Sequence, residues 1–385
     1  MIYLDNAATT PTAPEVIEAM LPFYERRYGN PSALYDLGQK SHDAIEESRK
    51  IIAQSIGAQP EEIYFTAGGS ESDNWALKAT AEAYKEKGKH IITSKIEHHA
   101  ILHTCEWLER QGFEVTYLDV DENGRINPAD VEAAIRPDTI LISIMFANNE
   151  IGTIEPIAEI GAIARAHGVL FHTDAVQAFG QEPIQVDEMN IDMLSSSGHK
   201  LNGPKGIGFL YIRKGVKIRS FVHGGAQERK RRAGTENVPA IAGLGEAAEE
   251  IYENLDEKRA HLYGLKQRFI DGIEKLEGTH VNGKTGEDSA PHIVSVSFEG
   301  IRSEVLLHSL EDRGIYVSSG SACSSNNHAG KQKGSKTLRN IHLKENLLDS
   351  TLRFSFSVHT TEEEIDYALE VLGELLPVLK KYTRH

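Results

Sequence analysis

Short runs rich in β-branched and aromatic residues alternate with helical patterns through the middle of this chain of 385 residues. The helical stretch 157–167 places Ile160, Ile163 and Ala164 on one face. Such alternation predicts an α/β fold, with a large and mostly parallel sheet covered by helices on both faces. The strands that we expect are 63–65, 90–93, 115–118, 140–144, 169–172, 193–195 and 207–212.

The pattern changes after a helical stretch at 239–255. The apolar runs 293–298 and 351–356 predict further strands, and Thr361 with Glu364 forms the capping box of a last helix. We therefore expect a second, smaller α+β domain. The expected boundaries are 11–255 for the large domain, and 1–10 with 256–385 for the small one.

The charge balance excludes one broad class of function. A net charge of −16 argues against a nucleic-acid-binding surface, which needs clustered positive charge. The basic run 229–232 is a local exception. A solvated loop and a position near a phosphate are equally good interpretations of it.

Neither a membrane nor an oxidising compartment is indicated. No apolar run is long enough to span a bilayer, and residues 1–5 lack the basic start and apolar core of a signal peptide. Cys105 and Cys323 lie far apart in the chain, so we do not expect a disulfide framework. We expect a protein of the reducing cytoplasm, with no membrane partner and no direct nucleic-acid partner.

Two chemically suited residues follow two of the expected strands. Asp174 ends the run from 169, and Lys200 stands in a turn rich in hydroxyls and glycines after the run at 193–195. Ligands of such folds bind at the carboxyl ends of the strands. A lysine amine can hold pyridoxal phosphate (PLP) as a Schiff base, and an aspartate can keep its pyridine nitrogen protonated. The pair therefore predicts a PLP site.

A glycine-rich turn, 66–74, joins the first expected strand to a helix. Gly68 and Gly69 allow the backbone to approach an anion closely, the helix N-terminus offers N–H groups, and Ser70 adds a hydroxyl. The spacing matches neither a Walker loop nor a dinucleotide fingerprint, so a plain turn is the alternative. Combined with Lys200, the turn predicts a phosphate site.

His98 and His99 follow another strand end. An imidazole there can stack on a flat aromatic cofactor and exchange protons near neutral pH. A helix-capping or core histidine is the alternative. Adjacent side chains point in different directions, so at most one of them serves, and the spacing does not suit a metal pair. We therefore expect no metal.

Taken together, these motifs resemble the cysteine desulfurases of the NifS/IscS type, within the class V aminotransferase group of PLP proteins. The resemblance covers nearly the whole chain and implies fold type I of the PLP-dependent transferases. Its motifs occur in one order along the chain, at 3–10, 29–32, 66–74, 97–99, 148–152, 174–177, 197–200, 234–237, 318–323 and Arg353.

The resemblance implies a role for each residue at the cofactor. Lys200 would hold PLP and remove the Cα proton of the substrate, and Asp174 would pair with the pyridine nitrogen. Gln177 would bond the ring oxygen, while His98 would stack on the ring and manage a thiol proton. The phosphate would be held by Gly69, Ser70, Ser197, His199 and, from the partner subunit of a homodimer, Thr235.

The resemblance also implies the substrate site. Arg353, helped by Asn149, would clamp the carboxylate of L-cysteine with a bidentate fork that a lysine does not reproduce. Asn149 would contact the cofactor as well. With Thr235 at the dimer interface, the basic run 229–232 would lie near that interface too.

Cys323 lies in a loop of small polar residues, 318–327, which we expect to be mobile. Cys105 instead shares a helical face with Ile101 and Leu108, as buried structural cysteines do. By resemblance, Cys323 would attack the substrate sulfur, become a persulfide and release L-alanine. The long loop implies direct transfer of sulfur to an acceptor protein, for iron–sulfur cluster assembly or tRNA thiolation.

Other functions remain open at this point. An aminotransferase of the same fold needs no loop thiol, and a selenocysteine lyase would discriminate against cysteine. A non-catalytic dimeric scaffold would be free to lose Lys200 or Cys323, and this chain has both. The chain departs from the family pattern at Ser70, where relatives carry threonine, and at 30–35 and 357–359.

Overall fold

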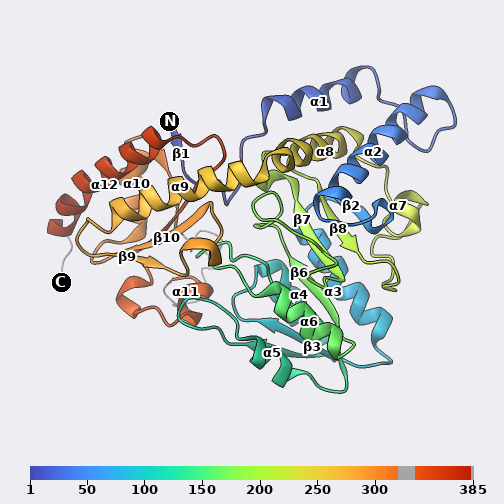
Figure 1. Cartoon of the computed structure of the whole chain (residues 1–385), viewed down its shortest axis with the longest axis horizontal. Helices are drawn as coiled ribbons and strands as arrows, with labels where there is room; N and C mark the ends of the chain where they lie inside the picture. Colours follow the sequence, from blue (N-terminus) through green and yellow to red (C-terminus); the bar gives the residue numbers. More distant parts are fainter. Residues whose placement is uncertain (320–333, 383–385) are drawn as a thin grey trace.

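The computed structural model describes residues 1–319 and 334–382. Its largest sheet has seven strands in the order β2-β8-β7-β6-β5-β3-β4 (Figure 1). All neighbours from β7 to β4 pair in parallel, and β8 is antiparallel to β2 and β7. The predicted α/β fold with a mostly parallel sheet is confirmed. The strands are β2 (Ile63–Thr66), β3 (His90–Ser94), β4 (Glu114–Leu118), β5 (Thr139–Ser143), β6 (Leu170–Asp174), β7 (Met193–Ser197) and β8 (Gly208–Ile212).

Helices cover both faces of this sheet. They are α1 (Pro14–Glu25), α2 (Asp36–Ser55), α3 (Gly69–Tyr84), α4 (His99–Arg110), α5 (Pro128–Ala134), α6 (Ile157–Ala166) and α8 (Val238–Glu253). Ile92 and Phe171 point to the face packed against α2, α5, α6 and α8, whereas Ile91 and Met193 point to α3 and α4. Successive strand residues alternate between faces, so the apolar runs of the sequence fill both interiors.

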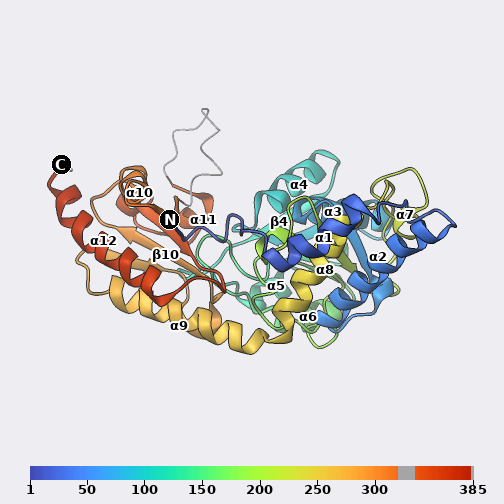
Figure 2. The same ribbon diagram turned by 90° about the horizontal axis from the view of Figure 1, so that it is seen from above.

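A smaller antiparallel sheet, in the order β12-β13-β10-β9, lies at the other end of the molecule (Figures 1 and 2). It has its own core, in which Phe269, Leu310 and Leu372 from three helices meet Phe354 of the sheet. The elements of this part are β9 (Thr279–Asn282), β10 (Ile293–Phe298), β12 (Ser318–Ser319), β13 (Thr351–Ser355), α9 (Leu255–Ile273), α10 (Ser303–Glu311), α11 (Lys336–Asn340) and α12 (Glu362–Tyr382).

The capping box predicted for the last helix is present. The Thr361 N–H donates to Glu364 Oε2 at 3.1 Å, and the Glu364 N–H donates to Thr361 Oγ1 at 3.3 Å. Helix α9 was not foreseen in the sequence. It begins directly after Asn254, where α8 stops, and leads the chain from the first core to the second (Figure 2).

The N-terminal segment also runs from one core to the other. Strand β1 (Ile2–Tyr3) pairs in parallel with β11 (Ile315–Tyr316). Leu4 belongs to the core of the small sheet, and Ala7 to the core of the large one. The residues between them are therefore held where the two parts meet. The domain boundaries given above remain a prediction.

Cys105 is fully buried on α4 in a cluster with Ile101 and Leu108, which confirms its predicted structural position. Burial raises the pKa of its thiol far above the usual range, so it stays protonated. Within the described residues, none of the helices combines the length and the apolar character needed to cross a membrane.

The basic run 229–232 begins within helix α7 (Gln227–Lys230) and continues past its end. The Arg231 guanidinium lies 5.3 Å from the centre of the Tyr64 ring. Arg232 donates to Glu71, in the first turn of α3, at 2.8 Å. The run thereby contacts the helix whose N-terminus is predicted to bind phosphate.

A buried ion pair holds this region, and it generates a stability prediction. Both carboxylate oxygens of Glu228 accept from Arg49, at 2.8 and 2.9 Å, and one also accepts from the Phe65 N–H at 2.8 Å. Glu228→Ala removes the buried carboxylate of this pair and leaves Arg49 only its ion pair with the more exposed Glu46, at 3.0 Å, so it should lower the free energy of unfolding by roughly 3–5 kcal/mol. Urea unfolding at one fixed protein concentration measures the loss.

Lys40→Ala is the matched control, because it breaks an exposed ion pair with Asp36. Such pairs contribute about 0–1 kcal/mol. Equal losses in the two variants would contradict the stabilising role given to the Arg49–Glu228 pair.

Candidate active site

A cavity of about 430 Å³ lies at the carboxyl-terminal edge of the large sheet. Strand β6 ends at Asp174 and β7 ends at Ser197, and both residues line the cavity. Its remaining wall comes from the N-terminal segment and from β12 and β13 of the small sheet. The cavity therefore lies between the two cores.

The structure brings most of the predicted site residues to this one cavity. Its lining includes Gly69, Ser70, His98, Asn149, Asp174, Gln177, Ser197, His199, Lys200 and Arg353. Thr235 is exposed and lies outside the lining. Cys323 lies outside the described residues. The individual roles of these residues remain predictions.

Lys200 reaches the cavity from a single 3₁₀ turn, Gly198–Lys200, directly after β7. Its Nζ donates to the main-chain carbonyls of Ala7 at 2.6 Å and Ala8 at 2.8 Å. The N-terminal segment thus positions the lysine.

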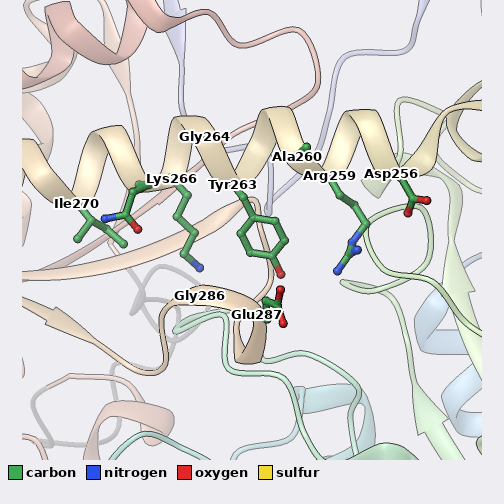
Figure 3. A pocket seen from close by; sticks show the side chains of 10 residues that line it. Asp256, Arg259, Ala260, Tyr263, Gly264, Lys266, Ile270, Gly286 and Glu287 are labelled. Carbon is green, nitrogen blue, oxygen red and sulfur yellow. The ribbon is translucent and has the colours of Figure 1, made fainter.

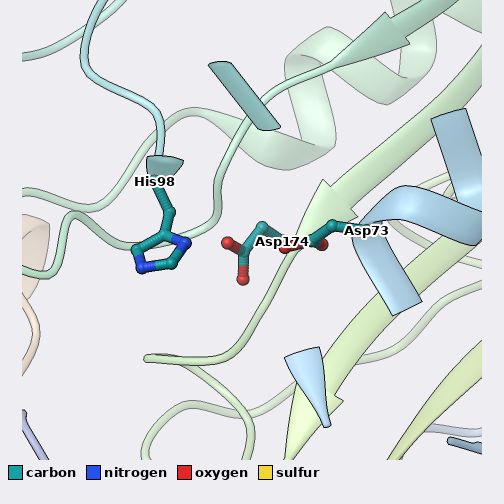
Figure 4. A group of neighbouring side chains, drawn as sticks. All are labelled: Asp73, His98 and Asp174. Carbon is teal, nitrogen blue, oxygen red and sulfur yellow. The ribbon is translucent and has the colours of Figure 1, made fainter. Parts of the chain in front are cut away.

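Asp174, His98 and Asp73 line the cavity and lie close to one another (Figure 4). One nitrogen or oxygen atom from each of these three side chains lies within 4.8 Å of those of the other two. Burial raises the pKa of Asp174, while His98 and Lys200 oppose the rise. Burial and the charge of Asp174 also raise the pKa of Asp73 well above its usual value.

His98 is also the N-cap of α4. Its Nδ1 accepts from the Ala100 N–H at 3.1 Å, so the proton of the neutral ring lies on Nε2. The helix-capping interpretation is therefore correct for the Nδ1 atom of this side chain. The same ring also lines the cavity. Burial lowers the pKa of His98, while the charge of Asp174 opposes the change.

The glycine-rich turn lines the cavity through Gly69 and Ser70. Helix α3 begins at Gly69, where an added Cβ would lie 2.6 Å from Val176 Cγ2, so only glycine fits. The first turn of a helix leaves N–H groups that an anion can accept. Ser70, Ser197 and His199 surround this point. Burial lowers the pKa of His199 to about 4, so it acts as a neutral donor or acceptor.

Arg353 comes from the small sheet and is 7% exposed. It donates to the Asn149 carbonyl oxygen at 2.7 Å and to Asp5 Oδ1 at 2.7 Å. Its Nε has no hydrogen-bond partner among the described residues. Asn149 and Asp5 therefore orient the guanidinium at the wall of the cavity.

Sequence reasoning missed Asp5, Asp73 and Glu97, which also line the cavity. Asp73 follows Ser70 by three residues, and Glu97 directly precedes His98. A helical spacing and a strand end were signals that could have found them. Neither signal distinguishes a cavity residue from an ordinary surface acid, because whether an acid lines the cavity depends on which other elements the fold brings near it.

Comparisons with known proteins agree with this geometry. The family model described as aminotransferase class V matches residues 2–368, nearly the whole chain. The chain belongs to the class V aminotransferase family. Proteins of this family, and the cysteine desulfurases within it, generally depend on PLP.

Individual relatives agree over the full length. The protein named cysteine desulfurase IscS of Methanosarcina thermophila is 54% identical over 379 residues, covering 98% of this chain and 93% of the relative. A solved NifS-like protein superposes with a TM-score of 0.91 at 38% identity, covering 98% of this chain and all of the other. A structure described as SspA in complex with cysteine has a TM-score of 0.82 at 39% identity, with 94% and 100% coverage.

The acid beside His98 generates a pH prediction. Burial raises the pKa of Glu97 from 4.5 to about 8. Below pH 4.5 this carboxyl is protonated in both folded and unfolded chains. Between pH 4.5 and 8 the folded chain must bind a proton that the unfolded chain has lost, so stability falls as the pH rises.

Glu97→Gln is a neutral substitute that keeps an acceptor for the Met145 N–H, now 3.0 Å away. Relative to the parent protein, it should gain up to about 5 kcal/mol in unfolding free energy at pH 8 and almost nothing at pH 4.5. Denaturant unfolding at the two pH values measures the difference in unfolding free energy between the variant and the parent protein. A difference of the same size at both pH values would show that Glu97 is not protonated in the folded protein.

Proposed function

We propose that the protein is a PLP-dependent cysteine desulfurase. It removes sulfur from L-cysteine, releases L-alanine and keeps the sulfur as a persulfide on Cys323. The observation that carries the proposal is one cavity that combines Lys200, Asp174 and Arg353. A nucleophilic amine, a buried acid and a carboxylate-binding guanidinium are the three groups that an amino-acid-processing PLP enzyme needs. The relatives named cysteine desulfurase support the choice of reaction.

The residues of the cavity fit PLP. A buried carboxylate suits the pyridinium nitrogen, a helix N-terminus with hydroxyls suits the phosphate, and the Lys200 amine lies in the same cavity. When bound, PLP supplies an electron sink that makes the Cα proton of cysteine acidic. Gly69, Ser70, Ser197 and His199 would hold the phosphate, and Asp174 would hold the ring nitrogen.

The chain's own groups orient the substrate and move its protons. Arg353 binds the carboxylate of cysteine with its guanidinium, while Asn149 and Asp5 fix the guanidinium plane. Lys200 takes the Cα proton on Nζ. His98 exchanges the thiol proton at Nε2, because its Nδ1 is held by the Ala100 N–H.

Cys323 is proposed as the sulfur acceptor. Ser318 and Ser319 line the cavity, and Cys323 follows Ser319 by four residues. Four extended residues reach at most about 14 Å, which is long enough to return to the cavity. Cys105 does not suit this role, because it is fully buried and burial raises the pKa of its thiol.

A homodimer is proposed, with Thr235 of one subunit reaching the phosphate of the other. The exposure of Thr235 leaves it available to a partner. Tyr24, Tyr28, Leu34 and Tyr35, which lie close together in the sequence, are also exposed, and exposed apolar side chains that are grouped together support an interface. The acceptor of the sulfur is proposed to be an iron–sulfur scaffold protein or a tRNA-thiolating enzyme in the cytoplasm.

Removal of the thiol tests the reaction. Cys323→Ala should release sulfide from cysteine at least ~100-fold more slowly and still bind PLP, because the cofactor site lacks only the acceptor. Sulfide and alanine assays measure the rate, and the visible absorbance of bound PLP measures the cofactor. Cys105→Ala is the control and should keep the parent rate. A Cys323→Ala enzyme that works at full rate would refute the role of this residue.

Substitution of the arginine tests the substrate site. Arg353→Lys keeps the charge but loses the planar fork, so KM for L-cysteine should rise roughly 10- to 100-fold. PLP absorbance should persist. Arg268→Lys alters an exposed ion pair with Asp366 and serves as the control. An unchanged KM in Arg353→Lys would place the carboxylate elsewhere.

A further inference from the structure

Gln177 lines the cavity, and the structure determines which way its side-chain amide points. One end of the amide lies 3.0 Å from the Ala7 carbonyl oxygen. That oxygen only accepts hydrogen bonds, so the amide end beside it must be the Nε2 group. The Oε1 atom then faces the other way, where it lies 3.0 Å from His292 Nε2.

This arrangement also determines the tautomer of His292. Gln177 Oε1 is an acceptor, so His292 Nε2 must carry a hydrogen and donate it. Both side chains are almost completely buried, at 3% exposure for His292 and 5% for Gln177. The Nδ1 atom of His292 has no hydrogen-bond partner among the described residues, in keeping with an unprotonated ring nitrogen.

We propose that His292 is a positioning residue, which locks the Gln177 amide so that a hydrogen of Nε2 is directed at the ring oxygen of the cofactor. The inference rests on the proposed function. Nε2 carries two hydrogens: one is donated to Ala7, and the second is available to the cavity. A fixed neutral donor there stabilises the negative charge of the ring oxygen.

The surroundings keep His292 neutral, as this role requires. Burial and, to a smaller extent, the positive charges of Lys266, Arg353 and Lys200 lower its pKa to about 3. A doubly protonated ring would bring a second donor and an uncompensated charge into this site.

Contacts on both sides of His292 hold it against Gln177. Its carbonyl oxygen accepts from the Phe356 N–H at 2.9 Å. Two residues earlier, the Ala290 carbonyl accepts from Lys266 Nζ of α9 at 2.8 Å, and Ser289 Oγ accepts at 2.6 Å. Figure 3 shows Lys266 leaving α9 on the side of the chain segment at Gly286 and Glu287. The small sheet and α9 thus deliver a hydrogen-bond donor to a residue of the large sheet domain.

The experiment is a pH titration of the visible absorbance of bound PLP. His292→Phe keeps a ring of similar shape but offers no N–H. Its titration midpoint should rise by about one pH unit, because the amide is no longer held as a donor toward the ring oxygen. His292→Gln, which can place a donor near the former Nε2, should restore most of the original midpoint. His292→Leu serves as a second donor-free variant if the phenylalanine variant does not fold.

Two controls separate positioning from a general structural effect. In a Gln177→Met background, His292→Phe should cause no further shift, because the amide it acts through is gone. His90→Phe removes a fully buried histidine that contacts Thr116 and Thr139 at the start of β3, and it should leave the midpoint unchanged.

The outcomes are distinct. An unchanged midpoint in His292→Phe, or a shift that persists without Gln177, would overturn the inference while leaving the proposed function intact. A parent protein that shows no visible absorbance with PLP would instead refute the proposed function.

Discussion

The parallel pairing of β6 with β7 is the constraint on which the site depends. Asp174, the last residue of β6, pairs in register with Ser195 of β7. The residues that follow two adjacent parallel strands leave the sheet at the same edge. The acid that suits the ring nitrogen and the turn that presents Lys200 are therefore brought side by side, although 25 residues separate them along the chain.

A second constraint is the N-terminal segment, which passes between the two cores. The Ala7 carbonyl accepts from Lys200 and also from Gln177, and Asp5 accepts from Arg353. Three cavity residues from different elements thus depend on a few residues of extended chain. The segment is held in place because Leu4 is buried in one core and Ala7 in the other.

Predictions from the sequence were strongest where chemistry and local pattern coincide. Lys200, Asp174 and His98 each follow an apolar run, and strands that end at one edge of a sheet must place such residues together. His292 carries no comparable signal, since it precedes a strand of the small sheet and reaches Gln177 only after the two parts pack. Asp73 was missed for the same reason: its raised pKa results from burial beside Asp174, a neighbour that is about 100 residues away in the chain.

The amino-acid sequence by itself determined the alternation of strands and helices, the anion-binding turn and the identity of the reactive groups, because these follow from local periodicity and from side-chain chemistry. Only the tertiary structure decided which carbonyls accept from Lys200, which acids are buried beside each other and which way the Gln177 amide points. Those properties depend on distances between elements far apart in the chain and on the exclusion of water, and no local pattern encodes either.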